Sequence, residues 1–338
     1  MKFCVFGAGA VGGFVGGLMA RNAADTGAEV SLVARGAQLD AIRANGLRVI
    51  AGGEEFTVET PATDDPASLG VQDVVFVTAK AHALTAAAAA MTPLLGPETV
   101  VVAAQNGIPF WYFHKHGGTL DGHTLQTVDP GGRIAATIGC DRVIGCVINS
   151  SNMVAEPGVI RNIGNRSFAL GEPDGSASER VKRVSAALEA GGLEAPVLPT
   201  IRDELWAKMW GNVSFSPMAA LTLSTLGPLV EREDLQALGV RIMEEVQTVG
   251  EALGVTFTAK IADRVEMTRR VAGHKTSILQ DLEAGRPMEV DGITGAVVEI
   301  ARLLDIETPM INLIYALLRQ RAREAGLYPE IGVDPLAG

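Results

Sequence analysis

Residues 3–14, FCVFGAGAVGGF, decide the fold of this chain, because a short apolar run leads directly into a G-x-G-x-x-G pattern. The run 3–6 predicts a buried strand, the glycines predict a tight turn, and 11–22 predict a helix. In such a unit the first glycine permits the turn, the second lets the backbone approach a pyrophosphate, and the third lets the helix pack closely on the strand. Unpaired N–H groups at the helix N-terminus complete a phosphate site. We therefore expect a dinucleotide to be bound by the six residues of the motif, Gly7, Ala8, Gly9, Ala10, Val11 and Gly12.

Beyond this unit, strand and helix patterns alternate, which is typical of a doubly wound, Rossmann-type α/β domain with a parallel sheet. The expected strands are 29–34, 56–59, 73–78 and 99–104, the expected helices 36–45 and 83–95, followed by a β-rich stretch over 134–171 and a last strand over 194–199. After Thr200 the periodicity becomes helical. The expected helices there are 202–224, 234–253, 259–284, 289–304 and 309–323. The sequence thus predicts a Rossmann-type domain over 1–199 and an all-helical domain over 200–330.

The length and composition disfavour several classes of protein. A chain of 338 residues is long enough for two domains, each with its own core. A formal net charge of -11 disfavours nucleic-acid binding. The most apolar long segment, 84–104, is interrupted by prolines, a glycine and a glutamate, so no membrane span is expected. Three cysteines and five histidines lack metal-ligand spacing, and we expect a cytoplasmic protein without a metal.

The residues after the second expected strand select the cofactor. NAD-binding folds usually place an acidic residue there for the ribose hydroxyls, whereas this chain has Ala34-Arg35-Gly36. The planar guanidinium of Arg35 suits a 2′-phosphate, and Lys80, after the strand over 73–78, provides a second cation. The alternative is that Arg35 only solvates a loop. The missing acid favours NADPH.

Three further patterns contain polar groups suited to a reaction site. Asn106, in Gln105-Asn106-Gly107, follows an expected strand and either binds the nicotinamide ribose or the substrate, or simply forms a turn. Lys208, Asn212 and Ser216 are spaced by four on one expected helical face, so the lysine is either a surface residue or a buried functional ammonium. The segment SILQDLEAGRPMEVDG begins at Ser277 and contains Glu289 between two helices.

In this order, the patterns resemble the ketopantoate reductase family, the 2-dehydropantoate 2-reductases of vitamin B5 biosynthesis. The resemblance extends over 2–323 through GAGAVGG, Arg35, Lys80, QNG, ELWAKMWGN at 204–212 and SILQDLEAGRPMEVDGI at 277–293. It implies NADPH-dependent reduction of the 2-oxo acid ketopantoate to (R)-pantoate. By this resemblance Lys208 is the catalytic lysine and Glu289 binds the substrate hydroxyl. The remaining polar groups assigned to the substrate are Asn106, Asn212, Ser216 and Ser277, and Asn106 and Glu289 are also counted among the cofactor contacts. We further expect a homodimer.

The chain departs from the family pattern at three places. Ser216 stands where a second asparagine is typical, Arg161-Asn162 replaces a histidine-containing segment, and 114–130 resembles an insertion. These differences leave open a relative that reduces another 2-oxo acid or ketone. The sequence also leaves open a dinucleotide-sensing protein without turnover, and an enzyme resembling 6-phosphogluconate or 3-hydroxyacid dehydrogenases.

Overall fold

The computed structural model describes residues 1–330 and residue 335, and the chain forms two compact units. The first unit contains the ranges 1–105, 111–123 and 133–201. The second contains the helical residues from 202 onward together with two loops from the preceding half of the chain, 106–110 and 124–132.

The first unit is built on a nine-stranded sheet, in the order β4-β3-β9-β8-β7-β6-β1-β2-β5. The strands are β1 Lys2–Phe6, β2 Glu29–Val33, β3 Leu47–Ala51, β4 Glu54–Val58, β5 Ala62–Thr63, β6 Val74–Val77, β7 Val100–Ala103, β8 Val143–Glu156 and β9 Val159–Gly171. Its helices are α1 Ala10–Arg21, α2 Ala23–Thr26, α3 Gly36–Asn45, α4 Leu84–Met91, α5 Arg133–Ile138 and α6 Glu179–Ala190. The predicted Rossmann-type fold is confirmed, although the sheet is mixed, because the β3–β4 and β8–β9 pairs are antiparallel.

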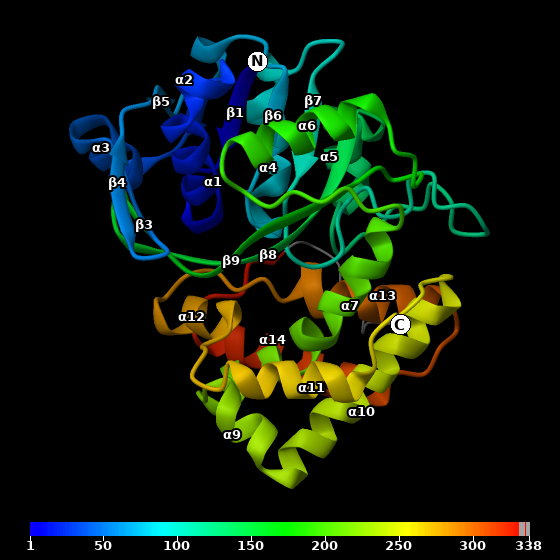
Figure 1. Cartoon of the computed structure of the whole chain (residues 1–338). Helices are drawn as coiled ribbons and strands as arrows, with labels where there is room; N and C mark the ends of the chain where they lie inside the picture. Colours follow the sequence, from blue (N-terminus) through cyan, green and yellow to red (C-terminus); the bar gives the residue numbers. More distant parts are fainter. Residues whose placement is uncertain (331–334, 336–338) are drawn as a thin grey trace. The chain divides into compact units, whose positions relative to one another are not determined.

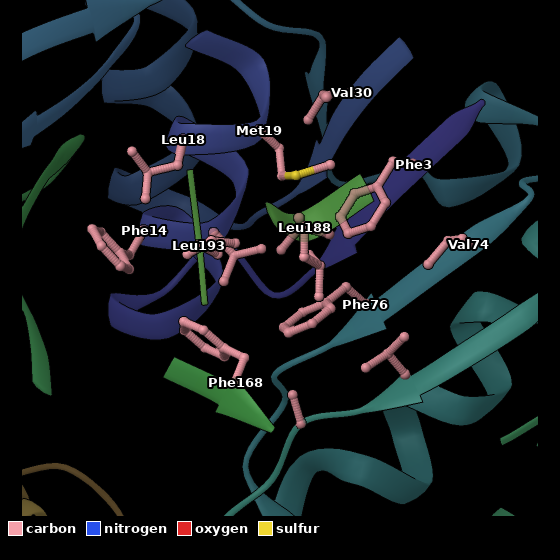
Figure 2. Packing of buried hydrophobic residues seen from close by; sticks show 14 of the residues in the cluster. Phe3, Phe14, Leu18, Met19, Val30, Val74, Phe76, Phe168, Leu188 and Leu193 are labelled. Carbon is pink, nitrogen blue, oxygen red and sulfur yellow. The ribbon is translucent and has the colours of Figure 1, made fainter. Parts of the chain in front are cut away.

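Alternate residues of the strands build the core of this unit. Phe3 and Phe76, from neighbouring strands, stack with ring centroids 6.1 Å apart, and Phe168 approaches Phe76 edge-on at the same distance (Figure 2). Side chains from α1 and α6, among them Phe14 and Leu188, complete this cluster. In the central strands β6 and β7 the intervening residues are buried as well, as expected for a sheet covered on both faces.

The strand order places a switch point beside β1. From β1 the chain runs to β2, which pairs with β1 on one side. On the other side of β1 follow β6 and β7 (Figure 1). In open α/β sheets, ligands bind outside the carboxyl ends of the strands at such a point. The glycine-rich turn follows β1 directly, so the topology and the motif indicate the same position.

Two predictions for this unit were wrong in part. Residues 134–138, expected to begin the β-rich stretch over 134–171, lie in the helix α5; the run contains two alanines, which favour a helix. The last strand expected over 194–199 forms only isolated bridges from Glu194 and Val197 to β9. Pro196 lacks the N–H that a continuous ladder needs.

The second unit is helical. Its elements are α7 Ile201–Val213, α8 Phe215–Thr222, α9 Leu226–Glu231, α10 Glu233–Ala252, α11 Ile261–Arg270, α12 Ser277–Glu283, the π-helical turn η6 Asp291–Gly295, α13 Ala296–Leu303 and α14 Pro309–Glu324. Helices α9, α10 and α11 pack against one another (Figure 1), and α8 packs on α12 and α14. Within the described part of the chain, every helix is too short or too polar to span a bilayer.

Two expected helices are interrupted. The helix expected over 202–224 breaks at Ser214, because Pro217 has no N–H to offer the carbonyl of Val213. The helix expected over 259–284 breaks over 271–276, where the carbonyls of Ala272 and His274 accept hydrogen bonds from the first residues of α9. Contacts with a neighbouring helix therefore replace the intrahelical bonds there.

Candidate functional site

The glycine-rich turn has the geometry of a phosphate-binding loop. Gly7 has a φ of +106°, and its N–H and that of Ala8 both donate to the carbonyl of Val33 at 3.0 Å. A Cβ on Gly12 would lie 2.1 Å from the Gly7 carbonyl oxygen and 2.6 Å from Oγ1 of Thr78. Two of the three glycines are thus explained by the fold alone, one by its backbone conformation and one by close packing of α1 on the strand.

Gly9 has a different explanation. It is the residue before α1, its backbone is extended, and a Cβ built on it would meet no atom of the described chain within 4 Å. Neither strain nor crowding requires glycine there. The space in front of Gly9 is what a pyrophosphate approaching the helix N-terminus would use.

A pocket of about 290 Å³ opens at this turn. Its lining comes from the ends of β1, β2 and β6 and from the segments that follow them, and comprises Phe6, Gly7, Ala8, Gly9, Val33, Ala34, Arg35, Gln38, Thr78, Ala79, Ala83 and Ala87. The turn is fixed from one side by Gln38, whose Nε2 donates to the Ala8 carbonyl at 2.9 Å and whose Oε1 accepts from the N–H of Gly158 at 3.0 Å. No sequence motif indicates this role for the glutamine.

The two cationic side chains predicted to contact the cofactor differ in how far they are buried. Arg35 lines the pocket, is exposed, and has no hydrogen-bond or ion-pair partner for its guanidinium among the described residues. Lys80 follows β6 and is half-buried, and its neighbour Ala79 lines the pocket. The strand end before Arg35 contains no carboxylate, so the pocket has a cation where NAD-binding folds usually have an acid.

The second unit brings Lys208 and Asn106 together. Lys208, on α7, is half-buried, and its Nζ donates a hydrogen bond of 2.8 Å to Oδ1 of Asn106. These two residues are far apart in sequence and belong to separate motifs. An amide oxygen orients the ammonium without neutralising its charge, which suits a proton donor.

The loop that contains Asn106 is fixed in place by the π-helical turn η6. Gly107 has a φ of +85°, and a Cβ on it would lie 2.2 Å from the carbonyl oxygen of Gly292. The same carbonyl accepts from the N–H of Ile108 at 3.0 Å. The Asn-Gly pair is therefore more than a local turn, because its backbone is docked on Gly292 in the second unit.

Glu289 lies two residues before this π-helical turn and is half-buried. The backbone N–H of its neighbour Met288 donates to the carbonyl of Leu327 at 3.0 Å. One residue beyond Val290, the carboxylate of Asp291 is buried and accepts hydrogen bonds from the hydroxyls of Tyr315 and Tyr328. This buried group, to which the sequence motif gives no role, is close in the chain to the predicted substrate contact.

The buried hydroxyl and carboxyl groups have shifted acidities. Burial raises the pKa of Asp291, although the two tyrosine hydroxyls act in the opposite direction. Burial, followed by the neighbouring charge of Asp291, raises the pKa of Tyr328 to about 12. The same causes raise the pKa of Tyr315. Both tyrosines consequently remain hydrogen-bond donors throughout the neutral range.

The remaining predicted substrate contacts are distributed over three helices. Asn212 is half-buried and follows Lys208 by one turn of α7, so it shares that face. Ser216 lies in α8, beyond the break at Ser214, so the spacing from Lys208 no longer places it on that face. Ser277 is the first residue of α12 and is exposed. Ser216 and Ser277 do lie on helices that pack together.

The segment predicted as an insertion is well anchored. Its flanking residues Tyr112 and Phe113 are buried in the first unit. In the second unit, the carboxylate of Glu299 accepts from the backbone N–H groups of Gln126 at 2.7 Å and Thr127 at 2.8 Å. No group of three or more metal-ligating side chains occurs among the residues that the structure describes.

Comparison with known proteins assigns this arrangement to a family. The model of ketopantoate reductase PanE/ApbA matches 3–175, and the model of the ketopantoate reductase PanE/ApbA C terminal matches 200–322. The chain belongs to the ketopantoate reductase family. The resemblance predicted from the sequence motifs is thus confirmed, and as a family member the chain is an oxidoreductase that acts on CH–OH donors.

Individual members of the ketopantoate reductase family match this chain over nearly its full length. A 2-dehydropantoate 2-reductase of Mesorhizobium japonicum is 48% identical over 328 residues, which cover 97% of the chain and 100% of the relative. The crystal structure of a candidate ketopantoate reductase from Ralstonia solanacearum MolK2 superposes with a TM-score of 0.90 at 39% identity, covering 96% of the chain and 99% of the other. A D-mandelate dehydrogenase solved with NADH and anilino(oxo)acetate has a TM-score of 0.81 at 19% identity, covering 97% and 100%, and shares the fold alone.

Proposed function

We propose that this protein reduces ketopantoate to (R)-pantoate with NADPH, the reaction for which its 2-dehydropantoate 2-reductase relatives are named. The observation that carries the proposal is the hydrogen bond of 2.8 Å between Lys208 and Asn106. It supplies an oriented ammonium on the helix that contains ELWAKMWGN. In this proposal the first unit holds the cofactor and the second unit binds the substrate.

The first unit fits NADPH in three respects. The open position at Gly9 admits a pyrophosphate, and the N-terminus of α1 offers it N–H groups. The exposed guanidinium of Arg35 is available to the 2′-phosphate, with Lys80 as the second cation of the same region. When bound, NADPH supplies the hydride.

The second unit supplies the group that stabilises the negative charge developing on the keto oxygen during reduction. As C2 of the 2-oxo acid gains a hydride, the electron pair of the C=O double bond moves onto the keto oxygen. Lys208 Nζ donates a hydrogen bond to this oxygen as its charge develops and then transfers the proton, which yields the hydroxyl. The lysine regains its proton from solvent. Asn106 orients the ammonium through its side-chain oxygen.

The other predicted residues complete the substrate site in this proposal. Glu289 accepts a hydrogen bond from the distal hydroxyl of ketopantoate, and Ser277 or Asn212 binds its carboxylate. Ser216, on the helix packed against that of Ser277, is a further polar group at the substrate. Asn106 and Glu289 also approach the cofactor in this proposal.

Replacement of Lys208 with alanine tests the proposal. Lys208→Ala should lower kcat for ketopantoate by roughly a hundredfold or more, the scale for one positioned proton donor. The Kd for NADPH and the Tm should stay near wild type, and the alkaline fall of kcat/KM should disappear. Lys182→Ala, which removes an exposed lysine from α6, is the matched control. Near-normal turnover by Lys208→Ala would show that this lysine is not the proton donor.

A second candidate function is reduction of a different 2-oxo acid with the same chemistry. Ser216, in place of the asparagine that the family typically has, favours it. Steady-state NADPH oxidation with ketopantoate and a series of other 2-oxo acids separates the two. Absence of oxidation with every acid would instead support a dinucleotide-sensing protein.

We further propose that the protein acts in the cytoplasm as a homodimer formed through its helical unit. Leu313 and Leu317, one turn apart on α14, are 53% and 49% exposed, which is high for leucines on adjacent turns. Light scattering should give about twice the chain mass of 35.3 kDa. A monomer at micromolar concentration would contradict this assignment.

A further inference from the structure

A buried carboxylate outside the proposed chemistry anchors the segment that contains Glu289. Asp291 is 4% exposed, and its Oδ1 accepts from the hydroxyl of Tyr315 at 2.7 Å. The hydroxyl of Tyr328 reaches both carboxylate oxygens, Oδ2 at 2.8 Å and Oδ1 at 3.0 Å. Such a group is costly to bury unless donors surround it, so the contacts to the two tyrosines are needed to keep Asp291 in place.

Tyr328 comes from the end of the described chain. After α14, Gly326 adopts a φ of +69°, and the chain then returns along 288–291. The carbonyl of Leu327 accepts from Met288 at 3.0 Å, one residue before Tyr328 reaches Asp291. Two arginines of α14 lie over the Tyr328 ring, with Cζ at 5.6 Å for Arg319 and 4.8 Å for Arg323.

These contacts lie on both sides of Glu289. On one side Met288 is tied to Leu327, and on the other Asp291 is tied to Tyr328 and Tyr315. The next residue, Gly292, supplies the carbonyl on which the loop of Asn106 is docked through Ile108. One anchored stretch therefore carries Glu289 and supports the loop of Asn106.

We propose that Tyr328, acting through Asp291, is a positioning residue for Glu289. The segment after α14 holds 288–291 so that the carboxylate of Glu289 meets the distal hydroxyl of the substrate. This inference rests on the proposed role of Glu289. Loss of the Tyr328 hydroxyl removes one hydrogen-bond donor from Asp291 and loosens the backbone beside Glu289. The Gly292 carbonyl that supports the loop of Asn106 lies inside η6, which keeps its own backbone bonds from Thr294 and Gly295 to Val290, so the contact of Asn106 with Lys208 is retained.

The test compares ketopantoate with 3,3-dimethyl-2-oxobutanoate, the same acid without its hydroxyl. Tyr328→Phe should raise KM for ketopantoate about five- to twentyfold and leave KM for the deoxy acid and the Kd for NADPH within about twofold. Asp291→Asn, which keeps the shape of the side chain, should change the preference in the same direction. Tyr112→Phe, in the first unit, is the matched control and should not change it.

A double-mutant cycle of Tyr328→Phe and Glu289→Ala tests whether Tyr328 acts through Glu289. If Tyr328 acts only through Glu289, adding Tyr328→Phe to Glu289→Ala should cause no further loss of preference for ketopantoate. The proposal is overturned if Tyr328→Phe lowers activity on both acids equally, or if its effect adds fully to that of Glu289→Ala. If Glu289→Ala itself leaves the preference unchanged, the substrate role of Glu289 fails, and the positioning role fails with it.

Discussion

Replacement of Gly9 with alanine should separate cofactor binding from folding. The added methyl group would meet no protein atom within 4 Å, and the extended backbone of Gly9 is accessible to alanine. A glycine-to-alanine change at such a position stabilises a protein by about 0.4–1 kcal/mol through the unfolded chain. The variant should thus fold at least as well as wild type. Its methyl group, however, occupies the space that a pyrophosphate would use, and steric overlap of this kind costs about 1–3 kcal/mol. The Kd for NADPH should rise about five- to a hundredfold.

Gly12→Ala should have the opposite profile. Its Cβ would lie 2.1 Å from the Gly7 carbonyl oxygen, a backbone atom that cannot rotate away, and 2.6 Å from Oγ1 of Thr78. The Thr78 hydroxyl donates to that same carbonyl at 2.6 Å, so both groups would have to move together. We expect at least the upper end of the overpacking range, about 3 kcal/mol, lost from the stability of the first unit.

Two measurements distinguish these effects. Thermal unfolding of the apo variants reports stability, and quenching or transfer of NADPH fluorescence reports the Kd. Gly273→Ala is the matched control, because this glycine also has open space around it and no positive φ. A Gly9→Ala variant that binds NADPH like wild type would refute the placement of the pyrophosphate, and a Gly12→Ala variant with unchanged Tm would refute the packing argument.

Two further predictions concern charge and pH. Arg35→Ala should raise KM for NADPH roughly ten- to a hundredfold, since a charge-assisted phosphate contact contributes about 1.5–3 kcal/mol, and should barely change KM for NADH; equal effects on both cofactors would exclude a contact with the 2′-phosphate. Burial lowers the pKa of His274 below its usual 6.5, so its contribution to stability is present above that pH and is lost as pH falls through the folded value. His274→Gln should therefore reduce the fall in Tm between about pH 7.5 and 5.5, and an unchanged slope would contradict this assignment.

The parts of the molecule that the sequence predicts are those with local causes. The first strand, glycine turn and helix depend on neighbouring residues, and helix α3 has the predicted bounds Gly36–Asn45. The strand β3, Leu47–Ala51, was not predicted, because its pairing with β9 is contributed by residues more than a hundred positions away. The two interrupted helices differ in this respect. Pro217 is a local signal in the sequence, although the helical periodicity continues past it, whereas the break over 271–276 depends on hydrogen bonds to α9 that the sequence does not show.

The candidate site likewise has features that the sequence predicts and features that only the folded chain shows. Lys208, Asn106 and Glu289 could be singled out because each lies in a recognisable motif, but the motifs do not say which of these side chains meet. The loop that contains Asn106, the partner of Lys208, is docked against Gly292 at Gly107, a close approach that needs a residue without Cβ. Only the folded chain shows that the glycine of this Asn-Gly pair serves packing as well as turning.

Asp291 shows that residue type alone does not distinguish a carboxylate that binds substrate from one that holds the backbone in place. In the sequence it is an acid two residues after Glu289, and either could have been the substrate contact. In the structure Asp291 is 4% exposed, with its oxygens occupied by the hydroxyls of Tyr315 and Tyr328, whereas Glu289 is half-buried. A carboxylate that is 4% exposed and already accepts from two tyrosine hydroxyls is reached by a substrate hydroxyl only if one of these contacts is broken, at a cost of about 1–3 kcal/mol. The burial of Asp291 therefore indicates a supporting role for that residue, and the proposal places substrate recognition at Glu289.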